Sequence, residues 1–194
     1  MNLASLLKDD EQLDAAEGAA SRGTGLLQEK GEQFLVCQSH SLLGHIHHSK
    51  GEQAKAIVYF EAASRVASSF NWHGQLFLAH HALAQLFVDE GSFDDAQAHI
   101  ECAKSHAVNH TYFLGHTIRL QAELWYKQYR LEEASSMNLR AADVYEKLGV
   151  VSDLNICRGL LRQIEEEMNK SVIPEELAGD GKSLAWDNVN CCAH

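Results

Sequence analysis

Histidine and cysteine are the side chains in this chain whose types could hold a metal ion or carry a nucleophilic reaction. The 194 residues include 12 histidines and 5 cysteines. His45 and His48 lie one helical turn apart, and His81 follows at a matching position further along the chain. Three imidazoles and a water molecule can complete the tetrahedral shell of a zinc ion. The spacing therefore leaves a zinc-binding protein as one interpretation of this sequence.

A second group, His99, Cys102 and His106, shares one face of a predicted helix, which we expect on the convex side. It lacks a fourth zinc ligand in the sequence. Cys102 and His106 are also four residues apart, yet nothing marks the third, orienting residue or the oxyanion hole that an activated nucleophile needs. We therefore predict no catalytic residues, no enzyme activity and no cofactor; the leading interpretation has no metal, and zinc binding stays as an alternative.

The elements that must position these side chains follow from a repeated spacing of small and large residues. Three stretches carry it: Gly44, Gly51, Ala56, Phe60 and Ala63; Ala84, Gly91, Ala96, Ile100 and Ala103; Ala122, Tyr129, Ala134, Asn138 and Ala141. A period near 40 residues suits a pair of helices with two turns. Small side chains let paired helices approach to about 9 Å, and Gly51 and Gly91 are expected to end the first helices in the left-handed conformation.

These residues resemble a known family. Leu43-Gly44, His47, Gly51, Ala56, Phe60 and Ala63 are similar to the tetratricopeptide repeat (TPR) consensus, over roughly residues 10 to 148. The resemblance implies an all-α fold, a right-handed superhelix of antiparallel helix pairs with a C-terminal capping helix. Tyr129 and Asn138 depart from the consensus, which has glycine and a large apolar residue there.

The predicted organisation has four parts. Residues 1–30 form a truncated first repeat, 31–149 three TPR-like helix pairs, 150–169 a capping helix and 170–194 a disordered tail. The capping helix is predicted from five apolar residues that recur on one face, which are Leu154, Cys157, Leu161, Ile164 and Met168. Arg158, Arg162, Glu165 and Glu166 occupy its other face.

A closer resemblance is carried by residues 69–73, 93–96, 120–126 and 144–149. These stretches are similar to the TPR tails of large fungal proteins that carry an NB-ARC or NACHT nucleotide-binding switch. Those proteins resemble NLR-type immune receptors, in which the tail senses a partner. The resemblance implies an alternative function, the sensor fragment of a receptor whose ATPase part lies outside this chain.

The TPR resemblance places ligand contact on the concave face, where a peptide or helix is held by hydrogen bonds and aromatic contacts. The repeat spacing puts these residues on that face: Ser41, His45, His48, His81, Gln85, Asp89, His116, Arg119, Glu123, Tyr126 and Lys127. We predict a protein-interaction scaffold whose partner is a protein or peptide. The other interpretation is that these residues are merely solvated.

Details of the groove narrow the prediction. The Lys and Asn residues of the chaperone-binding carboxylate clamp are absent from the matching positions. His116, Arg119, Tyr126 and Lys127 could instead bind an acidic segment, which Glu123 among them weakens. His40, His47 and His80 take positions where large residues pack, so we expect them to be buried or half-buried.

Charge and composition limit the partners and the compartment. The formal net charge of −11 disfavours nucleic acid and membrane surfaces. No run of about 20 apolar residues predicts a membrane span, acidic residues follow Leu7 too soon for a signal peptide, and the cysteines lack paired spacing. We expect a cytoplasmic protein with reduced thiols. Apolar residues within 3–27 favour self-association through the truncated first repeat.

Overall fold

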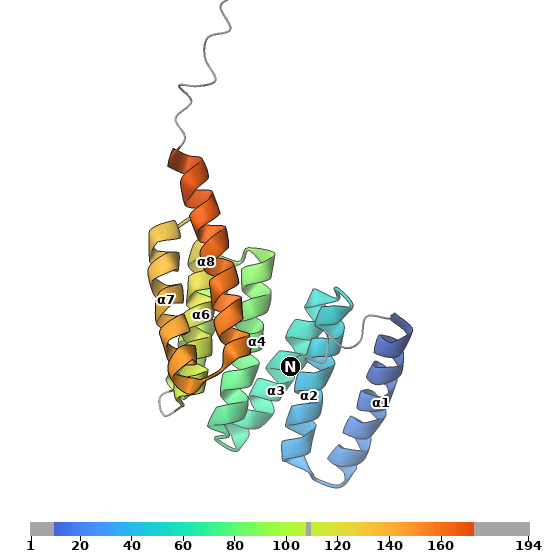
Figure 1. The fold of residues 1–194 in the computed structure, drawn as a ribbon. Coiled ribbons are helices and arrows are strands. Elements are labelled where there is room, and N and C mark those ends of the chain that lie inside the picture. The colour runs from blue at the N-terminus through green and yellow to red at the C-terminus, as the bar shows by residue number, and fades with distance from the viewer. Residues whose placement is uncertain (1–9, 108–109, 173–194) are drawn as a thin grey trace, which may run out of the picture.

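The computed structural model describes residues 10–107 and 110–172. Every regular element in these ranges is an α-helix, as the ribbon in Figure 1 shows. In chain order the helices are α1 (Asp10–Glu29), α2 (Gln33–Ser49), α3 (Gln53–Ser69), α4 (His73–Glu90), α5 (Phe93–His106), α6 (Thr111–Lys127), α7 (Leu131–Leu148) and α8 (Val151–Val172). The all-α fold class is confirmed.

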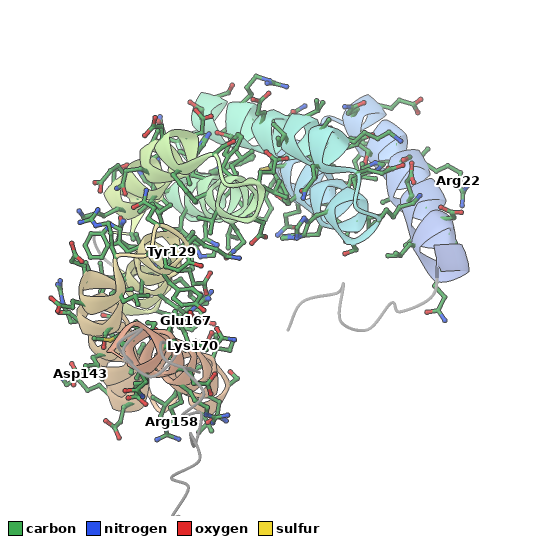
Figure 2. The ribbon with its side chains drawn as sticks, turned by 90° about the horizontal axis from the view of Figure 1, so that it is seen from above. Arg22, Tyr129, Asp143, Arg158, Glu167 and Lys170 are labelled. Atoms are coloured by element: carbon green, nitrogen blue, oxygen red, sulfur yellow. The ribbon has the colours of Figure 1, made fainter. Side chains whose placement is uncertain are left out.

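The helices pack as consecutive pairs. α2 packs against α3, α4 against α5 and α6 against α7, and each pair stacks on the next. α4 also contacts α2 and α6, and α6 contacts α8, so these four helices lie side by side in one layer. Seen from above in Figure 2, the stack curves into an arc with a hollow inner side. This arrangement is a TPR-like helical superhelix.

The small residues of the repeat lie where the paired helices meet. Ala56, Ala96 and Ala134 have no exposed surface, and Phe60 and Ile100 are 1% exposed beside them. Close packing of this kind leaves no room for a larger side chain without a shift of the backbone. The predicted register of the repeat is confirmed.

The turns between the helices use the left-handed backbone conformation where the sequence predicted it. Gly51 and Gly91 have φ angles of 73° and 79°. Tyr129, which replaces the consensus glycine, adopts φ 58° nevertheless. Its side chain is 78% exposed, so nothing but its own Cβ opposes this conformation.

Asn138 replaces a large apolar residue for a reason that lies in α8. It is completely buried, and its Nδ2 donates a hydrogen bond of 2.7 Å to the main-chain oxygen of Cys157. Cys157, Leu160 and Ile164 form the buried face of α8 against the last helix pair, with Leu154 and Leu161 half-buried at its margins. The opposite face of α8 is charged and exposed, as the periodicity predicted.

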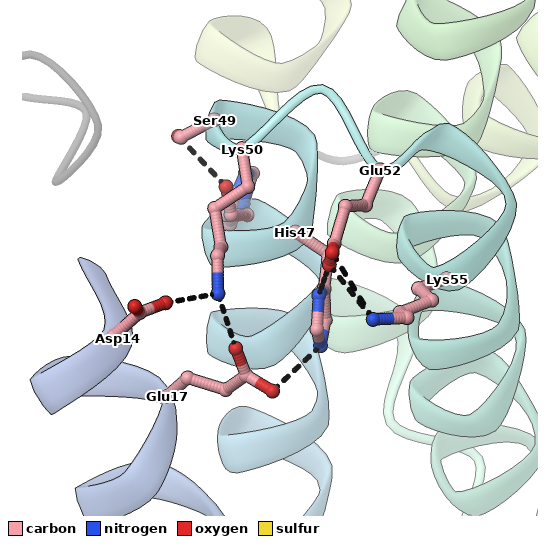
Figure 3. Close-up of polar contacts among 8 residues, drawn as sticks. Asp14, Glu17, His47, Ser49, Lys50, Glu52 and Lys55 are labelled. Carbon is pink, nitrogen blue, oxygen red and sulfur yellow. Dashed lines mark hydrogen bonds and ion pairs between the residues drawn. The ribbon is translucent and has the colours of Figure 1, made fainter. Parts of the chain in front are cut away.

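α1 is held against α2 by apolar contacts and by the ionic contacts that Figure 3 shows. Leu13 is 4% exposed, and Lys50 of the α2 C-cap pairs with Asp14 at 2.5 Å and with Glu17 at 2.6 Å. His47 is 1% exposed and places its Nδ1 2.6 Å from the carboxylate of Glu52. The burial predicted for His47 is confirmed.

The predicted tail and the predicted self-association surface lie partly outside the residues that the structure describes. The tail predicted from residue 170 overlaps α8, which continues to Val172; residues 173–194 lie outside the described ranges. Of the apolar residues expected to favour self-association, Leu13 is buried and Leu26 is 59% exposed.

None of the helices within residues 10–107 and 110–172 combines the length and the apolar character needed to cross a membrane.

Candidate partner-binding groove

The inner layer of helices forms a cavity of about 300 Å³ between α2, α4 and α6. Its polar lining consists of Ser41, His45 and His48 from α2, His81 and Gln85 from α4, and Arg119 from α6. Its apolar lining consists of Phe60, Leu78, Ala82 and Leu86. We call this space the first cavity.

A second cavity of about 330 Å³ continues the groove toward the C-terminus. Asp89 from α4 and Glu123, Tyr126 and Lys127 from α6 line it on one side. Ile156, Gly159, Leu160 and Gln163 of α8 line it on the other. Gln85 lines both cavities, so they adjoin and form one groove along the inner side of the arc.

Ten of the eleven residues predicted for the concave face line these two cavities. His116 is the exception. Its ring lies edge-on to Tyr112 at 4.5 Å and to Tyr145 at 5.6 Å, and its Nε2 stands 3.9 Å from Asp153. It is a packing residue behind the groove, which the spacing of one helix alone cannot distinguish from a lining residue.

The apolar part of the groove was not predicted from the sequence. Leu78 and Ile156 line the cavities with 47% and 49% of their surface exposed. Ile156 could have been predicted only by placing α8 in the inner layer, because one face of α8 then lines the groove. Exposed apolar side chains beside convergent polar groups are typical of binding sites.

Three polar atoms of the first cavity have no hydrogen-bond partner within the described part of the chain. They are Nδ1 of His48, Nε2 of His81 and Nε of Arg119, all shielded from solvent. A buried polar group without a partner costs about 1–3 kcal/mol. Because solvent does not reach these atoms, a ligand in the cavity would bond to them only after the lining side chains had moved.

Arg119 and Glu123 form an ion pair within α6, one turn apart, with side chains only 12% and 20% exposed. The pair brings no net charge to the groove, and the partner of the guanidinium is therefore already present. Because Glu123 neutralises Arg119, this pairing weakens a site for an acidic segment, as predicted from the sequence.

The pKa values of His45 and His81 in the groove are lowered by burial, so these two histidines are neutral at neutral pH. Burial lowers the pKa of His81 to about 3, with the charges of His116 and Arg119 acting in the same sense. Burial also lowers the pKa of His45, and that of His116 behind the groove. A neutral imidazole has one donor and one acceptor nitrogen, so the first cavity is suited to uncharged hydrogen-bonding groups.

The metal alternative finds no support in this groove. Among residues 10–107 and 110–172, no three or more His, Cys, Asp or Glu side chains are gathered as they would be around a metal ion. His45, His48 and His81 line the same cavity without forming such a group.

The helix pair α2–α3, which forms one wall of the first cavity, is similar to a known protein family. Residues 38–70, most of α2 and all of α3, match the family model described as tetratricopeptide repeat. The match and the fold support a TPR protein. The pairs α4–α5 and α6–α7 repeat the packing of the matched TPR pair. The search of curated proteins found no match to the chain.

Proposed function

We propose that this chain is a protein-interaction scaffold that binds a partner peptide in the groove formed by the first and second cavities. The observation that carries the proposal is the exposed side chain of Leu78 beside the polar side chains of Ser41, His45 and Gln85, which line the first cavity with it. Helical repeat folds are typically non-enzymatic, and the proposal includes no catalytic step.

The groove chemistry favours an uncharged segment in the first cavity. Amide groups of a peptide would exchange hydrogen bonds with the polar side chains of Ser41, His45 and Gln85 that line this cavity. An apolar side chain of the partner would pack against Phe60 and Leu86. The mixed charges of Asp89, Glu123 and Lys127 in the second cavity would then set the orientation of the peptide.

A photo-crosslinking residue at Gln85, the position shared by both cavities, tests this proposal. We expect it to capture partner protein in cells, whereas the same residue at the exposed Leu139 of α7 should capture little. Capture at Gln85 should be lost in Arg119→Glu, Tyr126→Ala protein that keeps its helical circular dichroism. Capture through Leu139 alone, or capture unaffected by the double substitution, would move the site away from the groove.

A second candidate, the sensor part of an NLR-like receptor, rests on the resemblance of residues 69–73, 93–96, 120–126 and 144–149 to fungal receptor tails. An immunoblot of native cells with an antiserum against residues 31–148 distinguishes the two candidates. A band near 21.5 kDa supports a free-standing adaptor. A band several times larger supports the receptor and removes the adaptor.

A further inference from the structure

Four histidines face one another across α4 and α5, away from the residues that line the groove. His73 and His80 lie two helical turns apart on α4, and His99 and His106 lie two turns apart on α5. Because the two helices run in opposite directions, His80 meets His99 and His73 meets His106. The Nδ1 atoms are 3.0 Å apart in the first pair and 3.2 Å apart in the second.

These separations are close to those of two imidazoles on one metal ion. Zinc–nitrogen bonds of about 2.0–2.1 Å at a tetrahedral angle place two ligand atoms about 3.3–3.4 Å apart. We propose that the His80–His99 pair binds a divalent transition-metal ion through its two Nδ1 atoms, and that the His73–His106 pair provides a second, more exposed site of the same kind. Imidazole ligands suit zinc, copper and nickel.

The surroundings of His80 and His99 hold both rings in place. Nε2 of His80 lies 3.4 Å from the hydroxyl of Ser64 on α3, and the ring of His99 stacks on Phe87 at 5.4 Å. A hydrogen bond on the remote nitrogen is the usual way in which a metal-binding histidine is oriented. The pair therefore meets the metal with little loss of side-chain freedom.

The charge state of the pair also suits a cation. Burial lowers the pKa of His80 to about 4, so at neutral pH protons compete little with a metal ion for the free lone pair of this ring. Burial also lowers the pKa of His99, while the carboxylates of Asp95 and Glu61 act in the opposite sense. Those two carboxylates make the neighbourhood of His99 attractive to a metal ion.

Metal binding needs a change of tautomer and a slightly wider separation of the two Nδ1 atoms. In the tautomer in which His80 donates from Nε2 to Ser64, its Nδ1 would accept a hydrogen bond from His99 Nδ1–H. When the metal takes both Nδ1 lone pairs, the proton on His99 moves to Nε2 of the same ring through water, so none is released overall. Two waters complete a four-coordinate shell, and with only two protein ligands the metal exchanges readily.

Titration of the whole chain with ZnCl₂ at pH 7.2, followed by calorimetry, tests the proposal. We expect one equivalent of zinc for each histidine pair. His99→Gln should remove the tighter equivalent, and His106→Gln the weaker. The exposed His110 packs against the ring of Phe113 and belongs to neither pair, so His110→Gln serves as the matched control and should change neither equivalent.

Circular dichroism and thermal melting without zinc show whether each variant folds. For a variant that folds less well, the zinc titration is carried out at a temperature at which the variant is folded. Unchanged stoichiometry in His99→Gln would overturn the proposal. Loss of zinc in His45→Ala with retention in His99→Gln would overturn it in favour of a metal site in the groove, and neither result bears on peptide binding there.

Discussion

Gly44 lies where α2 meets α3, and a methyl group added there would stand 2.7 Å from the ring of the buried Phe60. Gly74, near the start of α4, has no atom within 4 Å of the same position. The two glycines therefore differ in packing although both are helical. Single side chains of this kind determine how closely the helices of a pair approach.

This contrast predicts opposite effects of the same substitution. Gly44→Ala should lower the free energy of unfolding by about 1 kcal/mol or more, because overpacking of a dense core exceeds the gain in helix propensity. Gly74→Ala should raise it by about 0.5–1 kcal/mol. Urea unfolding followed by circular dichroism measures both, and equal shifts of one sign would contradict the close contact.

His81 predicts how stability depends on pH. Its pKa is lowered to about 3 in the folded chain, chiefly by burial, with His116 and Arg119 on α6 and His45 on α2 facing it. An unfolded histidine titrates near 6.5, so the unfolded state binds more protons below that pH. Stability is therefore full above about pH 6.5 and falls toward pH 3, by at most about 1.4 kcal/mol per pH unit from this group.

His81→Gln should accordingly lose less stability between pH 7 and pH 5 than the unchanged chain does. Urea unfolding midpoints at several pH values measure the difference. His110→Gln, at an exposed position, should follow the unchanged chain. Parallel curves for His81→Gln and the unchanged chain would show that this histidine is protonated freely in the folded state.

At the scale of the elements, α8 joins the array through an apolar face that also makes polar contacts, of which the hydrogen bond of Asn138 is completely buried. Asn138 of α7 donates to the main-chain oxygen of Cys157, and both residues are completely buried. Cys157, Leu160 and Ile164 provide the buried apolar part of the contact surface. α8 thus packs on the last repeat by a device that a purely apolar consensus residue would not provide.

Asn138→Ala should therefore loosen α8 before the rest of the chain. The loss of a buried hydrogen bond and of side-chain volume should cost about 1–3 kcal/mol. Hydrogen exchange followed by mass spectrometry should show faster exchange in Val151–Val172 than in α2–α5. Ser136→Ala, at an exposed position of α7, is the control and should leave exchange unchanged; uniform acceleration in Asn138→Ala would contradict the local role.

At the scale of the whole molecule, each helix pair is stabilised mainly by the pairs beside it, because these make most of its contacts outside the pair. The first cavity depends on this stacking, since α2, α4 and α6 each contribute to its lining. A break in the central pair would therefore separate the two ends of the groove. No such break would follow from a change on the exposed surface of the same helix.

Ala96→Arg should unfold the middle of the array, because Ala96 has no exposed surface and an arginine overfills the contact of α5 with its neighbours. Ala98→Arg, two residues on and exposed, should melt close to the unchanged chain. Thermal melting by circular dichroism compares the two. Native-like melting of Ala96→Arg would show that Ala96 does not lie at a close helix contact and that the repeat has another register.

The sequence by itself determined the helices, the positions of close packing at Ala56, Ala96 and Ala134, and the inner stripe of the groove. These features depend on the helical period and on one repeated spacing, both of which are local along the chain. The glycines at 51 and 91 belong to the same class, because a left-handed cap is decided by one residue.

Only the tertiary structure decided which side chains of different helices meet. It placed His116 behind the groove, paired Asn138 with Cys157, and brought His80 to His99 across α4 and α5. It also placed Ile156 of α8 in the second cavity. Such contacts depend on the distance and rotation between helices, which the packing of many side chains sets together and which no spacing within one helix contains.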